Sequence, residues 1–185
     1  MTSLAGPQTG DKVRVFFALW PDASVAARMQ TIAQHWQQGL GGRVMREDSL
    51  HATLVFIGDI EADRLAAVCD LASGIASPGF EMQLDTTGCW PHNHIAYLGL
   101  RRIPEALHGL HLELAAGLSA IGIETEMRPL HPHVTLIRKA ECNRFEKQNP
   151  VSEPVAWTVR DFVLVKSSLS ANGSRYEQLG KWPLR

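Results

Sequence analysis

Two stretches decide how this chain folds: Leu50-His51-Ala52-Thr53-Leu54-Val55-Phe56 and His131-Pro132-His133-Val134-Thr135-Leu136-Ile137-Arg138. Each contains His-x-Thr-Leu followed by apolar residues, which is the composition of a buried strand. Alternate residues of a strand point to the same face, so the histidine and threonine of each copy project together. One such tetrapeptide arises easily by chance. Two copies in a chain of 185 residues predict that two strands direct two imidazoles into one cleft.

The sequence that precedes each motif also repeats. Residues 13–20 have the composition of a central strand, and 22–38 carry apolar residues at helical spacing behind a candidate N-cap, Asp22. The same order recurs at 94–100 and 104–121. The strand centre lies 36 residues before the motif histidine in the first half and 37 in the second. This internal β-α-β duplication predicts an α+β fold of two lobes, with antiparallel sheets lining a central cleft.

The rest of the chain divides into short elements. The pattern predicts a helix at 61–76, strands at 80–84, 157–168 and 175–182, a turn at 88–93 and a surface loop at 144–154. An Asn-Gly dipeptide at 172–173 favours a tight hairpin between the last two strands. Residues 1–11 are polar and contain glycine, so we expect a flexible tail. No linker divides residues 12–185, which we expect to form a single bilobal domain.

Composition narrows the range of partners. The formal net charge of −1 argues against a protein that coats duplex nucleic acid, although it permits binding of one RNA end. No apolar run approaches the roughly 18 residues of a membrane span, and the N-terminus lacks a signal-peptide core, so we expect no membrane association. The cysteines Cys69, Cys89 and Cys142 lack CxxC spacing. They are interpreted as reduced thiols, which indicates a cytoplasmic protein.

Paired histidines suit displacement at phosphorus. An imidazole has an ordinary pKa near 6.5, so one ring can act as base and the other as acid. The hydroxyls of Thr53 and Thr135 lie beside His51 and His133 on the expected strands and can donate to phosphate oxygens. This set needs no metal and no cofactor. A strained 2′,3′-cyclic ribose phosphate fits it, with water as nucleophile, and an RNA 5′-hydroxyl in place of water would join two strands.

The chain resembles the 2H phosphoesterase superfamily and, within it, the RNA 2′,3′-cyclic phosphodiesterases, also called 2′-5′ RNA ligases. The resemblance rests on residues 14–19 with Pro21, 50–58, 132–138, 168–169, Gly173, Tyr176 and 182–184. It implies that His51 donates a proton to the leaving 3′-oxygen and that His133 activates water, leaving a 2′-phosphate. It also implies that Arg138 lies near the phosphate.

The resemblance also implies the partners. The expected substrate is an RNA 3′ end that bears a 2′,3′-cyclic phosphate, in an oligonucleotide or a tRNA-like molecule. We expect a monomer with no obligatory protein partner. Two alternatives stay open. The substrate could be a small cyclic phosphate such as ADP-ribose 1″,2″-cyclic phosphate, or the chain could bind RNA ends without catalysis.

The candidate site residues also have structural interpretations. Each motif histidine alone would more often be a satisfied core residue, and threonine is a common strand former. Arg138 follows His133 by five residues, so a regular strand would turn it to the opposite face unless the strand bulges. Arg14 and Arg46 are interpreted as surface or packing charges.

A metal site is the other candidate chemistry. His92, His94 and His131 are close together in sequence, and the spacing of His131 and His133 is typical of ligands. No Asp, Glu or Cys follows at ligand spacing, however, so the sequence disfavours a metal centre.

Overall fold

The computed structural model describes residues 10–125, 129–145, 150–170 and 173–185. Within these ranges the strands are β1 (Lys12–Leu19), β2 (Arg43–Val44), β3 (Ala52–Glu61), β4 (Phe80–Trp90), β5 (Ile95–Gly99), β6 (His133–Arg138), β7 (Pro150–Val159), β8 (Asp161–Ser170) and β9 (Gly173–Pro183). The helices are α1 (Ala23–Leu40), α2 (Leu65–Ser73) and α3 (Glu105–Ala120), with short 3₁₀ turns η1 (Glu47–Ser49), η2 (Ala62–Arg64) and η3 (Cys142–Arg144). The predicted tail at 1–11 lies almost wholly outside the described residues.

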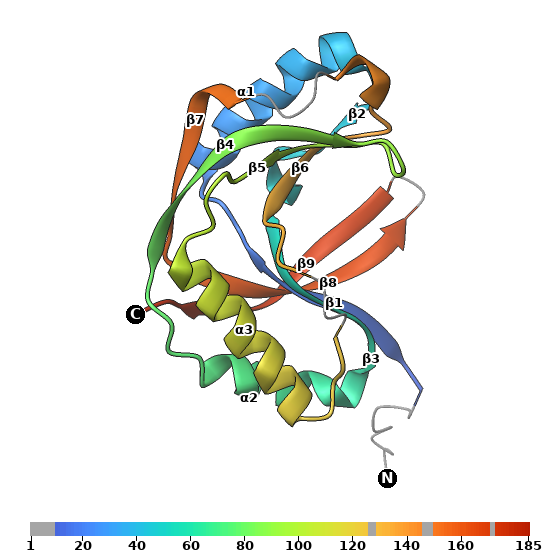
Figure 1. Cartoon of the computed structure of the whole chain (residues 1–185). Helices are drawn as coiled ribbons and strands as arrows, with labels where there is room; N and C mark the ends of the chain where they lie inside the picture. Colours follow the sequence, from blue (N-terminus) through green and yellow to red (C-terminus); the bar gives the residue numbers. More distant parts are fainter. Residues whose placement is uncertain (1–9, 126–128, 146–149, 171–172) are drawn as a thin grey trace.

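The described strands form one curved sheet in the order β7-β4-β5-β6-β3-β1-β8-β9, with β2 beside β6 (Figure 1). Every strand pair is antiparallel. The sheet is narrow at its middle, because β3 and β6 meet only where Ala52 pairs with Val134. Strands β3, β1, β8 and β9 therefore make one lobe, and β7, β4, β5 and β6 make the other. The prediction of two antiparallel lobes is confirmed.

The helices cover opposite ends of the sheet (Figure 1). Helix α1 belongs to the first half of the chain but packs on β6 and β7 of the second lobe. Helix α3 belongs to the second half and packs on α2 and on β3 of the first lobe. Each half thus contributes a helix to the other lobe, which holds the lobes together around their narrow junction.

Local sequence explains where these elements begin and pack. Asp22 caps α1, since its carboxylate accepts a hydrogen bond from the Val25 N–H at 2.9 Å. Helix α3 buries one stripe of leucines completely: Leu107, Leu110, Leu114 and Leu118. Strand β1 is buried on both faces from Val15 to Leu19, as expected of a strand with neighbours on each side.

Three predicted boundaries are wrong. The predicted loop at 144–154 overlaps β7, and the predicted strand at 157–168 belongs to two strands separated at Arg160. The buried alternation of Val155, Trp157 and Val159 explains why β7 forms. Strand β4 continues to Trp90, through part of the predicted turn. The hairpin of β8 and β9 forms, with Ser170 paired to Gly173, while residues 171–172 lie outside the described ranges.

The interpretation of all three cysteines as reduced thiols is also wrong. Cys89 and Cys142 form a disulfide, and their Cα atoms lie 5.5 Å apart. They are 53 residues apart in sequence and lie in β4 and η3, so only the folded topology brings them together. Cys69 is free. Among the described helices, none is long and apolar enough to cross a membrane.

Candidate active site

The junction of the two lobes brings the motifs together. Ala52 of the first motif pairs with Val134 of the second, and the strands are antiparallel. Extending this register by one residue in each direction puts His51 opposite Thr135 and Thr53 opposite His133. Residues opposite each other in a sheet share a face, so the four side chains form one patch. The histidines occupy one diagonal of that patch, a spacing of about 7–8 Å between Cα atoms.

Both motif strands bulge at the same place. In β3 the pairing with β1 skips Leu54, and in β6 the pairing with β5 skips Leu136. Each leucine directly follows the motif threonine. An extra residue shifts the alternation of side chains by one. The burial pattern agrees, because two successive buried residues follow each threonine and the next residue is exposed or half-buried.

The bulges decide which face of the sheet the fifth residue after each histidine occupies. Without a bulge that residue would face away from the patch, but the shift returns it to the cleft face. In the second motif this residue is Arg138, and in the first it is Phe56, which is 47% exposed. Arg138 lies near His51, whose pKa its positive charge lowers. The strand therefore has the bulge that Arg138 needs in order to face the cleft.

The two imidazoles are held in the same way. His51 Nδ1 lies 2.8 Å from the carbonyl oxygen of Ser49, and His133 Nδ1 lies 2.8 Å from that of His131. A carbonyl only accepts, so each Nδ1 carries the hydrogen. When either ring is neutral, its Nε2 is the basic nitrogen. The sequence thus sets both tautomers through a backbone carbonyl two residues upstream.

His51 is enclosed by aromatic side chains of the first lobe. Trp20 stacks on it with ring centroids 5.1 Å apart and planes at 6°. Phe16 and Tyr176 complete the enclosure at 5.1 and 5.0 Å. Burial lowers the pKa of His51 to about 4; the Ser49 carbonyl opposes this shift, and the positive charges of His133 and Arg138 add to it.

His133 has a comparable aromatic surround from the second lobe. The Trp90 ring contacts it edge-on with centroids 4.6 Å apart, and Tyr97 lies at 5.5 Å. Burial lowers the pKa of His133 as well, opposed by the hydrogen bond to the His131 carbonyl. The lowered pKa of each ring favours its neutral form in the unliganded site. A bound anion would favour the protonated form again.

A large cavity opens from the His133 side of the patch. We call it the histidine groove, and its volume is about 1020 Å³. It is lined by Thr53, Leu54, Val55, Phe56, Trp90, His92, Asn93, His108, His111, Leu112, Ala115, Thr125, Pro129, Leu130, His131 and His133. His111 of α3 also donates from Nδ1 to the Leu54 carbonyl at 2.8 Å, which secures the bulge of the first motif.

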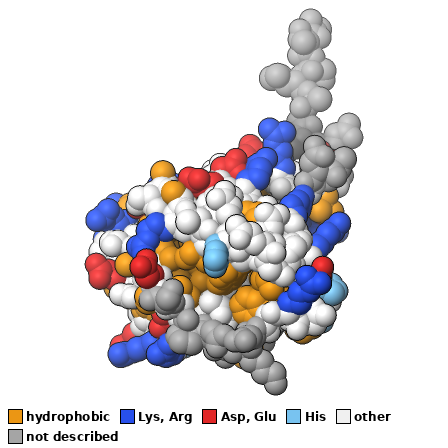
Figure 2. Space-filling view, turned by 90° about the horizontal axis from the view of Figure 1, so that it is seen from above, with side chains coloured by type: hydrophobic (Ala, Val, Ile, Leu, Met, Phe, Trp, Pro, Cys, Tyr) orange, Lys and Arg blue, Asp and Glu red, His pale blue; other side chains and the backbone are white. Residues whose placement is uncertain are grey.

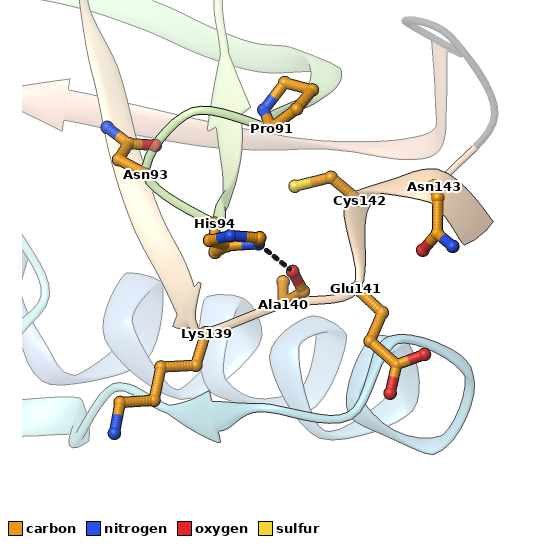
Figure 3. A pocket seen from close by; sticks show the side chains of 8 residues that line it. All are labelled: Pro91, Asn93, His94, Lys139, Ala140, Glu141, Cys142 and Asn143. Atoms are coloured by element: carbon orange, nitrogen blue, oxygen red, sulfur yellow. Dashed lines mark hydrogen bonds between the residues drawn. The ribbon is translucent and has the colours of Figure 1, made fainter.

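A second cavity of about 670 Å³ lies apart from the motif residues (Figure 3). It runs between the turn after β4 and the segment that follows β6. The backbone N–H of Ala140 donates to the His94 carbonyl at 2.9 Å, and the His94 ring contacts the Ala140 carbonyl at 3.3 Å. Figure 3 shows Lys139 and Glu141 extending away from each other, and the Cys142 sulfur directed toward Pro91. This cavity borders the disulfide and contributes no group to the patch.

The remaining charged and histidine candidates have other roles. Arg14 forms a two-point ion pair with Asp59 at 3.0 and 3.1 Å, and Arg46 pairs with Asp48 at 3.0 Å, as surface charges do. Across the described residues, no group of three His, Cys, Asp or Glu side chains could hold a metal ion, so the three histidines at 92, 94 and 131 form no such cluster.

The charge on the surface is mixed. Figure 2 shows acidic and basic side chains interspersed around one face, with hydrophobic side chains gathered at its centre beside a histidine. That view has no broad basic area of the kind that coats duplex RNA.

Sequence reasoning missed several residues of the site: Trp20, Phe56, Trp90, His111 and Tyr176. Phe56 could have been found, because it occupies the same position in its motif as Arg138 does in the other. The three remaining aromatic rings come from β4, β9 and the end of β1, and only the sheet order brings them to the histidines. His111 lies within α3, where it is half-buried and bonded to β3, and no local signal in the sequence marks that contact.

The fold and the site define a class. A bilobal antiparallel sheet with one His-x-Thr strand from each lobe, paired at a common junction, is the arrangement expected of a 2H phosphoesterase. The pattern of the family described as "LigT like Phosphoesterase" matches residues 19–97 and again 98–176, one match for each half. The chain belongs to this family.

Relatives with known names agree with the assignment. The chain is 34% identical over 175 residues to the RNA 2′,3′-cyclic phosphodiesterase of Escherichia coli K12, covering 92% of this chain and 96% of the relative. It is similar to the apo crystal structure of E. coli LigT, with a TM-score of 0.82 and 31% identity over 95% of this chain and 99% of that one. The structure of E. coli LigT complexed with 3′-AMP matches with a TM-score of 0.80 and 32% identity over 94% and 99%.

Proposed function

We propose that this protein hydrolyses RNA 2′,3′-cyclic phosphodiester ends to 2′-phosphomonoesters without a metal, using His51 and His133 as a proton-transfer pair. The observation that carries the proposal is the single Ala52–Val134 pairing, which arranges both histidines and both threonines in one patch. Relatives named RNA 2′,3′-cyclic phosphodiesterase support the choice of substrate.

The cyclic phosphate lies between the two imidazoles. The neutral Nε2 of His133 accepts a proton from water, whose oxygen attacks phosphorus in line with the leaving 3′-oxygen. His51, protonated, donates its Nε2 proton to that oxygen, and the phosphate remains on the 2′-oxygen. The proton gained by His133 and the proton lost by His51 balance over the reaction. Each positioned transfer contributes roughly 10²–10⁴-fold in rate.

The phosphate oxygens need donors as charge develops on them. Thr53 and Thr135 lie on the free diagonal of the patch, between the histidines, and their hydroxyls donate there. Arg138 supplies the fixed positive charge on the His51 side. Because burial and this charge disfavour protonated His51 in the free site, we infer that His51 takes up its proton when the anionic substrate binds.

The same patch can use an RNA 5′-hydroxyl in place of water, which would form a 2′-5′ linkage. Both histidines come from one chain, so we propose that the protein acts as a monomer with no obligatory protein partner. Residues 12–185 would then function as one bilobal domain.

We also propose a cytoplasmic location, which follows from the RNA substrate. Fractionation of cells, followed by detection of the protein in each fraction, tests this location. The protein is expected in the cytoplasmic fraction, and its recovery from the membrane or secreted fraction would contradict the proposal.

Product analysis on a cyclic-ended oligonucleotide in excess EDTA tests the function. The proposal predicts a 2′-phosphate as product and loss of turnover in His133→Ala. A 3′-phosphate would contradict the assignment of the leaving oxygen, and loss of activity in EDTA would contradict metal independence. Tight retention of the oligonucleotide without turnover would indicate an RNA-end binder. Turnover of ADP-ribose 1″,2″-cyclic phosphate alone would indicate a small-nucleotide enzyme.

A further inference from the structure

The histidine groove is larger than the space needed around the two motifs. Thr53 and His133 form one end of it, and the rest extends over α3, the turn after β4 and the entry to β6. A volume of about 1020 Å³ exceeds what a phosphate and a water molecule need. Because Thr53 and His133 line one end, a ligand in the groove would lie directly beside the reacting phosphate.

The lining of the groove has an unusual composition. Five of the eight histidines of the chain line it, and none of its described lining residues is Lys, Arg, Asp or Glu. Two of its side chains, Phe56 and Leu112, are 47% and 51% exposed although they are large and apolar. Flat apolar surfaces together with imidazole, amide and hydroxyl groups match unpaired bases, which present a π-face and hydrogen-bonding edges.

The α3 wall is a single helix face. His108, His111, Leu112 and Ala115 follow the i, i+3, i+4, i+7 spacing of one side of a helix. The bond from His111 to the Leu54 carbonyl fixes this face against the first motif strand. The wall is thus held at a constant position relative to Thr53, which a subsite for a flexible strand requires.

We propose that the histidine groove is a subsite for one or two unpaired RNA nucleotides that flank the reacting phosphate. This inference rests on the proposed function. The nucleotides have two sources: the strand that carries the cyclic end, or a second strand whose 5′-hydroxyl approaches from the side of His133, where the nucleophile enters. Both sources present the same stacked bases to Phe56 and the α3 wall.

The test compares two double variants. His108→Ala with Leu112→Ala alters the α3 wall, while His35→Ala with Ile103→Ala removes an exposed histidine and an exposed apolar side chain outside the groove. For each protein, kcat/KM is measured on a cyclic-ended mononucleotide and a cyclic-ended trinucleotide. A trinucleotide with a 5′-hydroxyl and no cyclic end serves as competitor. Fluorescence anisotropy of both labelled trinucleotides gives their binding without turnover.

If the substrate strand fills the groove, the wall variant loses about ten-fold in kcat/KM on the trinucleotide. It keeps the mononucleotide rate, and the control variant keeps both. If a second strand fills the groove, the competitor inhibits wild type and the wall variant requires about ten-fold more of it.

Equal trinucleotide binding by wild type and the wall variant, with unchanged length preference and unchanged competition, would overturn the proposal. An equal loss on both cyclic substrates would also overturn it, because the wall would then act only through the catalytic patch. If wild type hydrolyses neither substrate, the proposed function fails. The anisotropy comparison still decides the groove in that case.

Discussion

The two halves of the active site share their proton-handling geometry. In each half the histidine Nδ1 bonds the backbone carbonyl two residues upstream at 2.8 Å, and a threonine follows on the same strand face. In each half the leucine after that threonine forms a bulge. The duplication has thus kept the features that fix the tautomer and direction of each imidazole.

The halves differ in what lies around these shared features. The bulge of the second motif presents a cation, Arg138, to the cleft, whereas that of the first presents an apolar ring, Phe56. His51 is enclosed under Trp20 and Tyr176, while His133 opens onto the histidine groove. A duplicated site can therefore keep symmetric acid–base geometry while its two sides differ, and we propose that one side binds charge and the other binds bases.

The largest effect should come from the shared residues. His51→Ala and His133→Ala are each expected to lower kcat by roughly 10²–10⁴-fold, because each removes one positioned proton transfer. The double variant should fall short of the product of the two losses, since the pair acts as a unit. Single-turnover rates measure this, with His35→Ala as control. If His133→Ala kept most of the activity, the paired-histidine mechanism would be contradicted.

The next largest effects should come from Arg138 and Phe56, which each follow a motif histidine by five residues and should affect different kinetic constants. Arg138→Ala is expected to lower kcat by about 10²–10³-fold, as loss of an oxyanion donor does. Phe56→Ala should instead raise KM by about ten-fold through lost stacking, with kcat nearly unchanged. Steady-state kinetics on a cyclic-ended trinucleotide distinguishes these effects. Similar kcat and KM changes in both variants would show that the two sides have not specialised.

The threonines offer a smaller and symmetric test. Thr53→Val and Thr135→Val each remove a hydroxyl while keeping the side-chain shape, and each should cost about ten-fold in kcat, the value of a hydrogen bond to a charged group. Thr53→Ser and Thr135→Ser keep the hydroxyl and should retain most activity. Equal rates for the valine and serine variants would mean that the threonines only form strands.

The pH dependence of kcat/KM should reflect the lowered pKa values of the buried His51 and His133. The pKa of both histidines is lowered, that of His51 to about 4, so the free enzyme loses both protons below pH 6.5. We therefore expect kcat/KM to be bell-shaped with its maximum below pH 6.5 and to fall through neutrality. The limbs belong to the coupled pair. In kcat, which reports the complex, bound phosphate should move the basic limb to higher pH. Identical limbs in both profiles would contradict this shift.

The smallest effect should come from the bond that secures the first bulge. His111→Leu removes the donor to the Leu54 carbonyl and is expected to cost about 1 kcal/mol in free energy of unfolding, with a few-fold rise in KM. Chemical denaturation and steady-state kinetics measure both, with the exposed His35→Leu as control. No change in either quantity would remove His111 from the positioning of Phe56.

The sequence predicted the repeated parts of this site well. A His-x-Thr-Leu motif in a strand implies which side chains share a face, and two copies imply a common cleft. The helix that starts at Asp22 and the β-α-β order also follow from local signals. Such features depend on spacing within one segment, which the sequence contains directly.

The features that the sequence did not predict depend on pairing between distant segments. The bulges at Leu54 and Leu136 appear only in the sheet register, and the one at Leu136 decides the direction of Arg138. The enclosure of His51 by Tyr176 requires β8 to pair with β1 and β9 with β8. The Cys89–Cys142 disulfide joins residues 53 positions apart, which no spacing rule anticipates.

The central claim is that the two imidazoles contact one bound phosphate together. It can be tested by NMR of protein with ¹⁵N-labelled histidine, titrated with a 2′-nucleoside monophosphate and assigned with His51→Ala and His133→Ala. The account predicts that Nδ1 of both rings carries hydrogen throughout. It also predicts that both Nε2 signals shift along one binding curve with a single Kd. A shift in only one ring, or two independent binding curves, would contradict it.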